Sequence, residues 1–338
     1  MLLNIESEIK EHKNMRSSVL KLLRSRAGNY ISGEEIAKHL NVSRTAIWKH
    51  IRELKQTGYE IVSHAKRGYA LMGTPDLLLP NEVKSVLKSD LLGKEVVHFF
   101  DTDSTNNEAK KLAADGAVEG TIVVSEAQNS GRGRLSRGFF SPASKGIWLS
   151  VILRPSFAPQ HASKCTLVTA VAVTKAIEKF TGIRCGIKWP NDIFYEGKKL
   201  VGILTEMNAE MDAVNYIVIG IGINVNIAQA EFPEELQRIA TSLQVISGNA
   251  IERKELLSQV LVELESAYLE ILKNGFLHIL NEWKTYSITL GQAVNVIGID
   301  QTFSGIAKDI DEDGALLVET ENGVERVLAG DVSIRPKT

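Results

Sequence analysis

Cysteine is scarce in this 338-residue sequence, which contains only Cys165 and Cys185. We interpret these two thiols as a buried and inert pair rather than as a disulfide or a metal site. No apolar run is long enough to span a bilayer, and the first residues lack a signal-peptide pattern. We therefore expect a cytoplasmic protein that has no membrane partner.

The common nucleotide-binding motifs are also missing. No Walker A sequence occurs, and the glycine-rich stretch at 220–226 lacks both G-x-G-x-x-G spacing and an evident following helix. These absences argue against a P-loop and against a dinucleotide-binding fold. Composition is otherwise ordinary for a globular protein, with 44% hydrophobic and 24% charged residues. A chain of this length predicts two or three domains.

Charge is distributed unevenly along the chain, although the net charge is only −2. Residues 15–70 contain eleven Lys and Arg against four Asp and Glu, which indicates a polyanionic partner. Residues 286–338 show the opposite balance, four Lys and Arg against nine Asp and Glu. Nucleic-acid binding by this last part is therefore disfavoured.

Residues 15–75 follow the pattern of a winged helix-turn-helix. Residues 19–23 supply the apolar face of a first helix, Ser32 has capping-box spacing for a second, and Ser43 can cap a third. A hairpin over 59–72 would form the wing. A basic third helix preceded by a tight turn is typical of a DNA-binding domain.

The third helix and the wing tip are expected to contact DNA. The buried face of the third helix is expected to carry Ile47, Ile51 and Leu54, and its basic residues point away from that face. Trp48 is expected to pack at the helix edge rather than to read a base. An alternative is a helix-turn-helix that serves only protein contacts. The residues expected to contact DNA are Ser43, Arg44, Thr45, Lys49, Arg52, Lys66 and Arg67.

Between residues 80 and 285, apolar strands alternate with helices but without strict βαβ repetition. This pattern predicts an α+β domain with a mixed sheet that is covered by helices on one face. Strands are expected near 96–101, 120–125, 146–153, 183–189, 200–206 and 214–223, and helices near 105–115, 160–181 and 252–273.

The most informative stretch is 128–142, which holds three glycines and three arginines. Glycine lets the backbone approach a ligand closely, and arginine binds carboxylate or phosphate through two parallel hydrogen bonds. Such a loop suits a site that holds two anions together. A basic surface loop or a nucleic-acid contact is the alternative. Its glycine content also predicts mobility without ligand and closure over a bound one.

Three further polar clusters follow apolar strands. The first, Asp103–Asn106, offers small hydroxyl and amide groups that could cap a helix or form a hydrogen-bonding cup. The second is Lys188–Asp192, and the third is Gly220–Asn226. Lys199 begins an apolar strand, where a lysine is costly unless it meets an anion.

Four of these segments occur together in one order and spacing: Gly131–Arg134, Lys188–Asp192, Lys199–Leu204 and Gly220–Asn224. This combination resembles the biotin protein ligase family. With the winged helix ahead of it, the chain resembles the bifunctional bacterial form, the biotin operon repressor. The resemblance covers nearly the whole chain from about residue 15.

The resemblance implies a two-step activity. Biotin and ATP would give biotinyl-5′-AMP and pyrophosphate, and the biotinyl group would then pass to a lysine of a biotin carboxyl carrier protein. Acceptors would belong to acetyl-CoA carboxylase and other biotin-dependent carboxylases. The adenylate would also act as corepressor, with a homodimer on double-stranded operator DNA when it is bound. A ligand-sensing repressor without ligase activity and a lipoate-type ligase are the alternatives.

The resemblance also assigns residues. Arg132, Arg134, Lys188, Lys199 and Asp192 would be catalytic, and Asp192 would meet Mg²⁺ through water. Biotin would be bound by Ser104, Thr105, Asn106, Gln128, Arg132, Gly133, Arg134, Lys199, Gly202 and Leu204. ATP would be bound by Arg134, Phe140, Lys188, Asn191 and Asn224, and the segment 227–243 would order around the adenine.

Residues 286–338 are predicted to form a small antiparallel β-barrel, SH3-like in the family. Short apolar segments at 293–297, 303–310, 315–320 and 324–328 are separated by turns rich in Asp, Asn and Gly. The sequence thus predicts three domains, over 15–75, 80–285 and 286–338.

Overall fold

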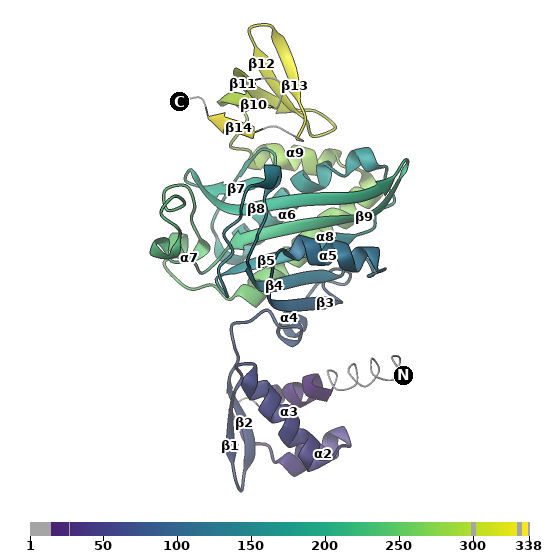
Figure 1. Cartoon of the computed structure of the whole chain (residues 1–338), viewed down its shortest axis with the longest axis vertical. Helices are drawn as coiled ribbons and strands as arrows, with labels where there is room; N and C mark the ends of the chain where they lie inside the picture. The colour runs from purple at the N-terminus through teal and green to yellow at the C-terminus, as the bar shows by residue number, and fades with distance from the viewer. Residues whose placement is uncertain (1–14, 27, 299–301, 330–332, 337–338) are drawn as a thin grey trace. The chain divides into compact units, whose positions relative to one another are not determined.

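The computed structural model describes residues 15–26, 28–298, 302–329 and 333–336 (Figure 1). The chain divides into two compact units, Met1–Asp76 and Leu77–Thr338. In the described part of the chain, every helix is too short or too polar to cross a bilayer.

The first unit is the expected winged helix-turn-helix. A helix over 15–25 precedes α2 (Gly33–Leu40) and α3 (Arg44–Gln56), and β1 (Glu60–His64) pairs with β2 (Gly68–Gly73) as an antiparallel hairpin. Both predicted caps form. The Ser32 hydroxyl accepts the backbone N–H of Glu35 at 2.9 Å, and the Ser43 hydroxyl accepts that of Ala46 at 3.1 Å.

The faces of α3 divide as the sequence pattern predicts, with one exception. Ile47, Ile51 and Leu54 are buried, and the basic residues of the helix are exposed. Trp48, which was expected to pack at the helix edge, is 53% exposed, and the Arg52 guanidinium carbon lies 5.0 Å from its ring centroid. The indole is covered by a neighbouring cation rather than by the core.

The second unit is built on a seven-stranded mixed sheet with strand order β3-β4-β5-β9-β8-β7-β6. Strands β3 and β4 are parallel, and the remaining neighbours are antiparallel, as expected for a mixed sheet. The strands are β3 (Val96–Thr102), β4 (Ile122–Gln128), β5 (Gly146–Leu153), β6 (Gly186–Lys188), β7 (Asp192–Tyr195), β8 (Lys198–Glu210) and β9 (Ala213–Asn224).

Helices cover this sheet on both faces, so the prediction of one covered face is wrong (Figure 1). One side packs against α6 (Lys164–Thr181), α8 (Arg253–Asn274) and α9 (Leu277–Tyr286). On the other, Ala109 and Ala113 of α5 (Thr105–Ala114) meet Val123, Ile152 and Val218. The reason lies in the strands, because consecutive residues such as Ile122 and Val123 are both apolar and point to opposite faces.

Some short elements escaped sequence analysis. They are α4 (Pro80–Val86), β7, α7 (Leu243–Ser247), α9 and the last strand β14 (Ser333–Pro336). The three-residue β6 occupies only part of the expected strand 183–189. Short segments carry too few residues for a periodic pattern to stand out.

The C-terminal part forms a five-stranded antiparallel sheet of order β13-β12-β11-β10-β14. Its other strands are β10 (Ala293–Ile297), β11 (Thr302–Ile310), β12 (Leu316–Thr320) and β13 (Gly323–Val327), close to the four predicted segments. Closure of this sheet into a barrel stays a prediction. Within the unit, Trp189 Nε1 donates to Gly314 O at 3.1 Å, which joins this sheet to the central domain.

A buried ion pair supports β4, the strand that leads into the loop of residues 128–142, which we call the glycine–arginine loop. Glu126 of β4 is 2% exposed and accepts hydrogen bonds from Arg253 of α8 at 3.0 Å and from the Leu78 backbone N–H at 2.7 Å. Burial alone would raise the pKa of Glu126, but His98 and Arg253 hold it below its usual value. The charged pair therefore ties α8 to the start of the unit.

Replacing Arg253 by Met should lower the free energy of unfolding by about 3–5 kcal/mol, because a buried carboxylate then loses its counter-charge. Urea unfolding followed by circular dichroism measures this. Lys308→Met is the matched control, since its ion pair with Glu319 is half exposed and should contribute less than about 1 kcal/mol. Equal losses in both variants would contradict the expectation.

Candidate active site

A cavity of about 330 Å³ opens on the sheet face that carries α5, and glycines form its floor. Gly202 of β8 and Gly222 of β9 are directly paired, and the Phe139 ring lies on them. A Cβ atom would come within 2.5 Å of that ring at Gly222 and within 2.7 Å at Gly202. Glycine in a strand interior here serves a close approach, because any side chain would displace the aromatic ring.

A polar cup closes one end of the cavity, where β3 turns into α5. Ser104, Thr105 and Asn106 are each at most 4% exposed and line the cavity. Ser104 holds the cap position of α5 but makes no side-chain cap hydrogen bond, so capping does not explain its hydroxyl. The Gln128 amide oxygen accepts the Thr105 backbone N–H at 2.9 Å, which joins the cup to the glycine–arginine loop.

The loop is tied at its two ends. The Gln128 backbone N–H donates to Ser141 O at 3.1 Å, and its side-chain amide donates to the Ser141 hydroxyl at 2.9 Å. Between these ends, Gly131 must be glycine, because a Cβ atom there would lie 2.4 Å from Phe139 O. The loop is therefore a flap whose two ends are joined to each other at the end of β4.

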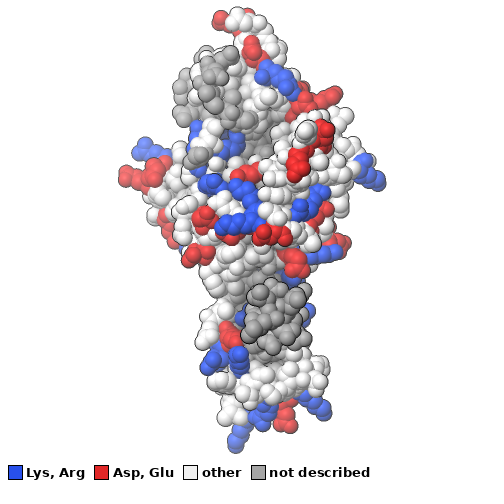
Figure 2. Space-filling model, turned by 45° about the vertical axis from the view of Figure 1, so that its right-hand side comes forward, with Lys and Arg blue, Asp and Glu red and all other residues white. Residues whose placement is uncertain are grey.

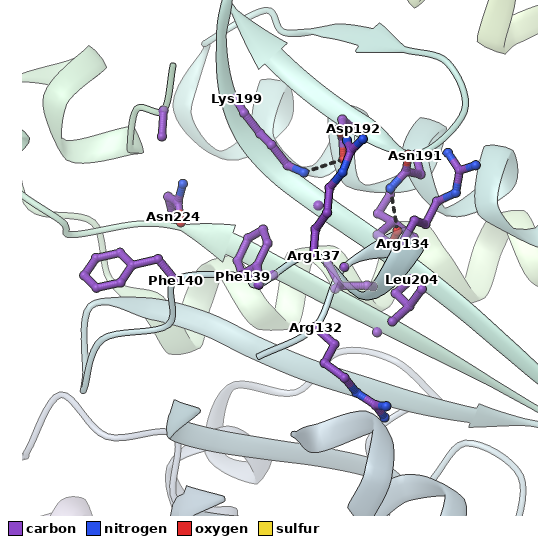
Figure 3. Close-up of a pocket in the computed structure, with 18 of the residues that line it drawn as sticks. Arg132, Arg134, Arg137, Phe139, Phe140, Asn191, Asp192, Lys199, Leu204 and Asn224 are labelled. Atoms are coloured by element: carbon purple, nitrogen blue, oxygen red, sulfur yellow. Dashed lines mark hydrogen bonds and ion pairs between the residues drawn. The ribbon is translucent and has the colours of Figure 1, made fainter. Parts of the chain in front are cut away.

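Three cations from separate elements line the cavity: Arg134, Lys199 and Lys188, whose ammonium lies 5.1 Å from the Phe194 ring centroid. Arg134 donates to the Asn191 side-chain oxygen at 3.2 Å and also to Ala329 O of the C-terminal part. Arg132 lines the cavity as well, but its guanidinium is turned towards α5, where it donates to Asn107 (Figure 3). The structure thus brings three of the four predicted cations together.

Lys199 meets an anion of its own chain. Its ammonium lies 2.7 Å from an Asp192 oxygen and 5.6 Å from the Phe139 ring centroid (Figure 3). Two backbone hydrogen bonds, to Ile239 O and from the Thr241 N–H, hold the start of β8 against the segment 227–243. A lysine opening an apolar strand is stabilised here by the carboxylate.

The far end of the cavity is aromatic and apolar. Phe140 and Phe232 lie 6.1 Å apart between ring centroids, and Leu236 and Ile239 also line the cavity. The side-chain amide of Asn224 donates to Thr241 O at 3.0 Å, so Asn224 holds the segment 227–243 against the sheet. A flat apolar ring would fit this end.

All predicted small-molecule residues line this one cavity: Ser104, Thr105, Asn106, Gln128, Arg132, Gly133, Arg134, Phe140, Lys188, Asn191, Asp192, Lys199, Gly202, Leu204 and Asn224. Sequence analysis assigned no role to Phe139, Arg137 or the individual glycines Gly220 and Gly222, which also line it. The glycine spacing was a usable signal, because residues two apart in a strand face the same side.

Asp192 alone would be a poor metal site. Its carboxylate already pairs with Lys199, and the described residues contain no group of three His, Cys, Asp or Glu that could hold a metal ion. Mg²⁺ commonly binds one or two carboxylates together with substrate phosphates and water. The residues present therefore fit a magnesium ion that arrives with a phosphate ligand, not a resident one.

Family models match three parts of the chain: an HTH domain over 16–70, the biotin/lipoate A/B protein ligase family over 99–224, and the biotin protein ligase C-terminal domain over 289–335. The bifunctional ligase/repressor BirA of Bacillus subtilis (strain 168) is 41% identical over 95% of this chain and 98% of that protein. BirA of Escherichia coli (strain K12) is 30% identical over 91% and 94% of the two chains.

Among solved structures, the biotin protein ligase of Aquifex aeolicus in complex with biotin and ATP is similar with a TM-score of 0.64. It is 31% identical and covers 72% of this chain and 100% of its own.

Brief trypsin digestion should cut the flap after Arg137 before it cuts after Arg134. Arg137 is exposed, whereas Arg134 is partly buried and anchored to Asn191 and Ala329. Mass spectrometry of the early peptides measures the order. Asn191→Ala should speed cleavage after Arg134, and a wild-type protein cut equally fast at both arginines would refute the anchoring.

Proposed function

Because the chain belongs to the bifunctional biotin ligase/repressor family, we propose that this cavity joins biotin to AMP and that the winged helix represses transcription. The single observation that supports the chemistry most is the convergence of Arg134, Lys188 and Lys199 on one cavity. The product of the first step is biotinyl-5′-AMP, which then gives its biotinyl group to a lysine.

The polar cup and the glycine floor suit biotin. The cup residues Ser104, Thr105 and Gln128 would face the urea head group, and Phe139 with Leu204 would flank the ring and chain. In the structure the Phe139 ring rests on Gly202 and Gly222, so a ligand ring that uses this floor must share it with Phe139 or displace it. The acid chain would then point towards Lys199.

The cations solve an electrostatic problem. A carboxylate must attack the α-phosphorus of ATP, and two unit charges about 4 Å apart repel by about 4 kcal/mol at an effective dielectric near 20. Lys199 and Arg134 would offset this repulsion and stabilise the charge that develops in the transition state, with Lys188 near the phosphates. Arg132 would have to leave Asn107 to join them.

Asp192 has two possible duties in this scheme. Its carboxylate holds the Lys199 ammonium in place before substrates arrive. When nucleotide is bound, it would accept water from a magnesium ion carried by the phosphates, and that ion would neutralise phosphate charge. Phe140, Phe232 and the segment 227–243 would enclose the adenine, while Asn191 and Asn224 fix the walls.

The second step needs no further nucleophile from the enzyme, because the mixed anhydride is itself electrophilic. We propose as acceptor the biotin carboxyl carrier protein of acetyl-CoA carboxylase and of other biotin-dependent carboxylases. An uncharged lysine of that protein attacks the carbonyl carbon, and AMP leaves. We propose that this reaction takes place in the cytoplasm.

Two alternatives compete with this proposal. A sensor without catalysis would not need the whole cationic set, and a lipoate-type ligase fits the breadth of the matched family model. The cup favours biotin, since its oxygens and amides suit a urea better than a dithiolane. The domain limits 15–75, 80–285 and 286–338 also stand as part of this proposal.

Pyrophosphate exchange into ATP tests the chemistry. The wild-type protein should exchange label when biotin is present and not with lipoate in its place. Lys199→Ala should reduce exchange by about 100-fold or more, because it removes a cation aimed at the reacting groups. Lys198→Ala is the matched control, since Lys198 directly precedes Lys199 in the chain but does not line the cavity. Lipoate-dependent exchange, or none at all, would reject the proposal.

DNA binding is supported by the exposed basic residues of α3 and of the wing. Arg44, Thr45, Lys49 and Arg52 are exposed on α3, and Lys66 and Arg67 form the wing tip. Ser43 has a structural duty as helix cap. Figure 2 shows lysine and arginine side chains on the surface of this unit, as phosphate contact requires. The polyanion is double-stranded operator DNA in this proposal.

Homodimer formation by the adenylate-bound protein is also proposed. Strand β3 is the last strand of the central sheet and pairs only with β4 among the described strands. Phe100 of β3 is 58% exposed. An open edge with an exposed aromatic side chain can pair with a second copy, and a two-fold dimer would present two winged helices to a palindromic operator.

Phe100→Asp should leave biotin-dependent exchange intact but keep the protein monomeric with biotin and ATP, because charge disfavours edge pairing. Sedimentation velocity measures the mass, and selection from a random duplex library measures DNA binding. Leu277→Asp on α9, where the side chain is 62% exposed, is the control and should still dimerise. A dimer of the Phe100 variant would exclude this edge.

A further inference from the structure

Glu206 of β8 lies outside the cavity lining but holds a residue of the polar cup. Its carboxylate accepts the Asn106 side-chain amide at 2.8 Å and the Lys110 ammonium at 2.6 Å. Burial alone would raise the pKa of Glu206, but hydrogen bonds from Lys110 and Asn106 keep it below its usual value. The group is therefore charged at neutral pH and can only accept hydrogen bonds.

This acceptor determines which way the Asn106 amide faces. Both amide hydrogens are directed at acceptors, Glu206 at 2.8 Å and Leu204 O at 3.3 Å. The Asn106 oxygen must then accept, and it lies 2.6 Å from the Ser150 hydroxyl. Ser150 is fully buried and owns one hydroxyl hydrogen, so that hydrogen goes to Asn106. Gly220 leaves room for this, because a Cβ there would lie 2.3 Å from the Asn106 oxygen.

Because Ser150 donates to Asn106, it must accept from Thr105. Their hydroxyl oxygens are 2.8 Å apart, and since the Ser150 hydrogen is already used, Thr105 donates. Thr105 also has one hydroxyl hydrogen. That hydrogen could go to the Gln128 side-chain oxygen at 3.2 Å or to Ser150 at 2.8 Å, and the shorter contact takes it because two hydroxyl oxygens 2.8 Å apart need a hydrogen between them. The Thr105 oxygen is then left to accept from a ligand. In this series of hydrogen bonds, the hydroxyl hydrogens of Thr105 and Ser150 are both donated away from the cavity.

On the opposite side of the cup, a separate pair of contacts determines the orientation of the Gln128 amide. The Ser141 hydroxyl donates to Phe139 O at 3.1 Å, so it accepts the Gln128 amide at 2.9 Å. This turns the Gln128 oxygen towards Thr105, whose backbone N–H it accepts at 2.9 Å. Two acceptor oxygens from Thr105 and Gln128 thus stand side by side at the cavity wall with no hydrogen between them.

We propose that Glu206 is a positioning residue that sets the hydrogen-bond direction of the cup, so that Thr105 and Gln128 together accept one ligand N–H. The inference rests on the proposed function, because the cyclic urea of biotin supplies N–H donors there. It adds a reason for selectivity, since a dithiolane ring has no N–H and would leave both oxygens unpaired.

Glu206→Gln tests the role with little change of shape. The new amide oxygen should face the Lys110 ammonium, so its NH₂ group would oppose the Asn106 amide and disturb the direction of the chain. We expect the KM for biotin to rise about tenfold and kcat to stay within about twofold, because the effect falls on binding. Glu108→Gln is the control: it removes a carboxylate of α5 that pairs with Lys111 at 2.7 Å, outside the cavity.

A rescue variant distinguishes a change in hydrogen-bond direction from a general structural effect of the substitution. Adding Lys110→Met to Glu206→Gln frees the amide oxygen to turn towards Asn106, and the KM for biotin should return towards the wild-type value. A purely structural role predicts further loss in the double variant. An unchanged KM in Glu206→Gln, or no rescue, overturns the proposal.

Direct binding by calorimetry adds a test that does not depend on catalysis. 5-(2-Thienyl)pentanoic acid keeps a sulfur ring and the acid chain but has no urea, so Glu206→Gln should not change its affinity. Equal losses for biotin and for this acid would overturn the proposal.

The wild-type protein supplies a readout even when the variant does not fold. One of the two biotin derivatives methylated on a single urea nitrogen should bind at least about tenfold more weakly than biotin, and equal binding of all three overturns the proposal. If biotin itself does not bind the wild type, the proposed function fails, which is a distinct result.

Discussion

Positive charge concentrated in one cavity is the constraint on which the rest of this structure depends. Lys199 and Arg134 come from separate elements, and each has an acceptor of the same chain, Asp192 and Asn191 respectively. Without those acceptors the like charges would repel one another and draw in water. The acceptors keep the cations aimed at the cavity, so little reorganisation is needed when anionic substrates replace them.

The glycines give that charge a place to act. Gly202 and Gly222 clear the sheet surface for a flat ring, and Gly131 allows the flap to close on its own base. The flap ends at Gln128, which lines the cavity beside the polar cup, and at Ser141, whose hydroxyl accepts the Gln128 amide. Because Gln128 takes part in both, we expect recognition of a head group to be linked to closure of the flap and exclusion of water.

The buried charges behind the site serve a different purpose. Glu126 joins Arg253, the Leu78 backbone and the loop residue Ser144 through hydrogen bonds of 2.7–3.2 Å. These contacts fix β4 immediately before Gln128. Glu206 plays the same kind of part for Asn106 on the other side of the cup. Carboxylates that do not touch the cavity thus hold the groups that do.

The chain of residues by itself determined the winged helix and the mixed sheet, and its resemblance to a known family supplied the list of cavity residues. Caps such as Ser32 and Ser43, apolar periodicity and the glycine–arginine loop are local signals, and local signals survive in a sequence. Even the unassigned Gly220 and Gly222 carried a readable period of two.

Only the tertiary structure decided which partners each group has. No sequence pattern could show that Asp192 pairs with Lys199, that Arg132 turns to Asn107, or that α5 covers the second face of the sheet. Trp48 was misjudged for the same reason, since its exposure depends on what packs beside α3. The hydrogen bonds from Asn106 to Glu206 and from Ser150 to Asn106 join residues 100 and 44 positions apart, and packing alone brings them together.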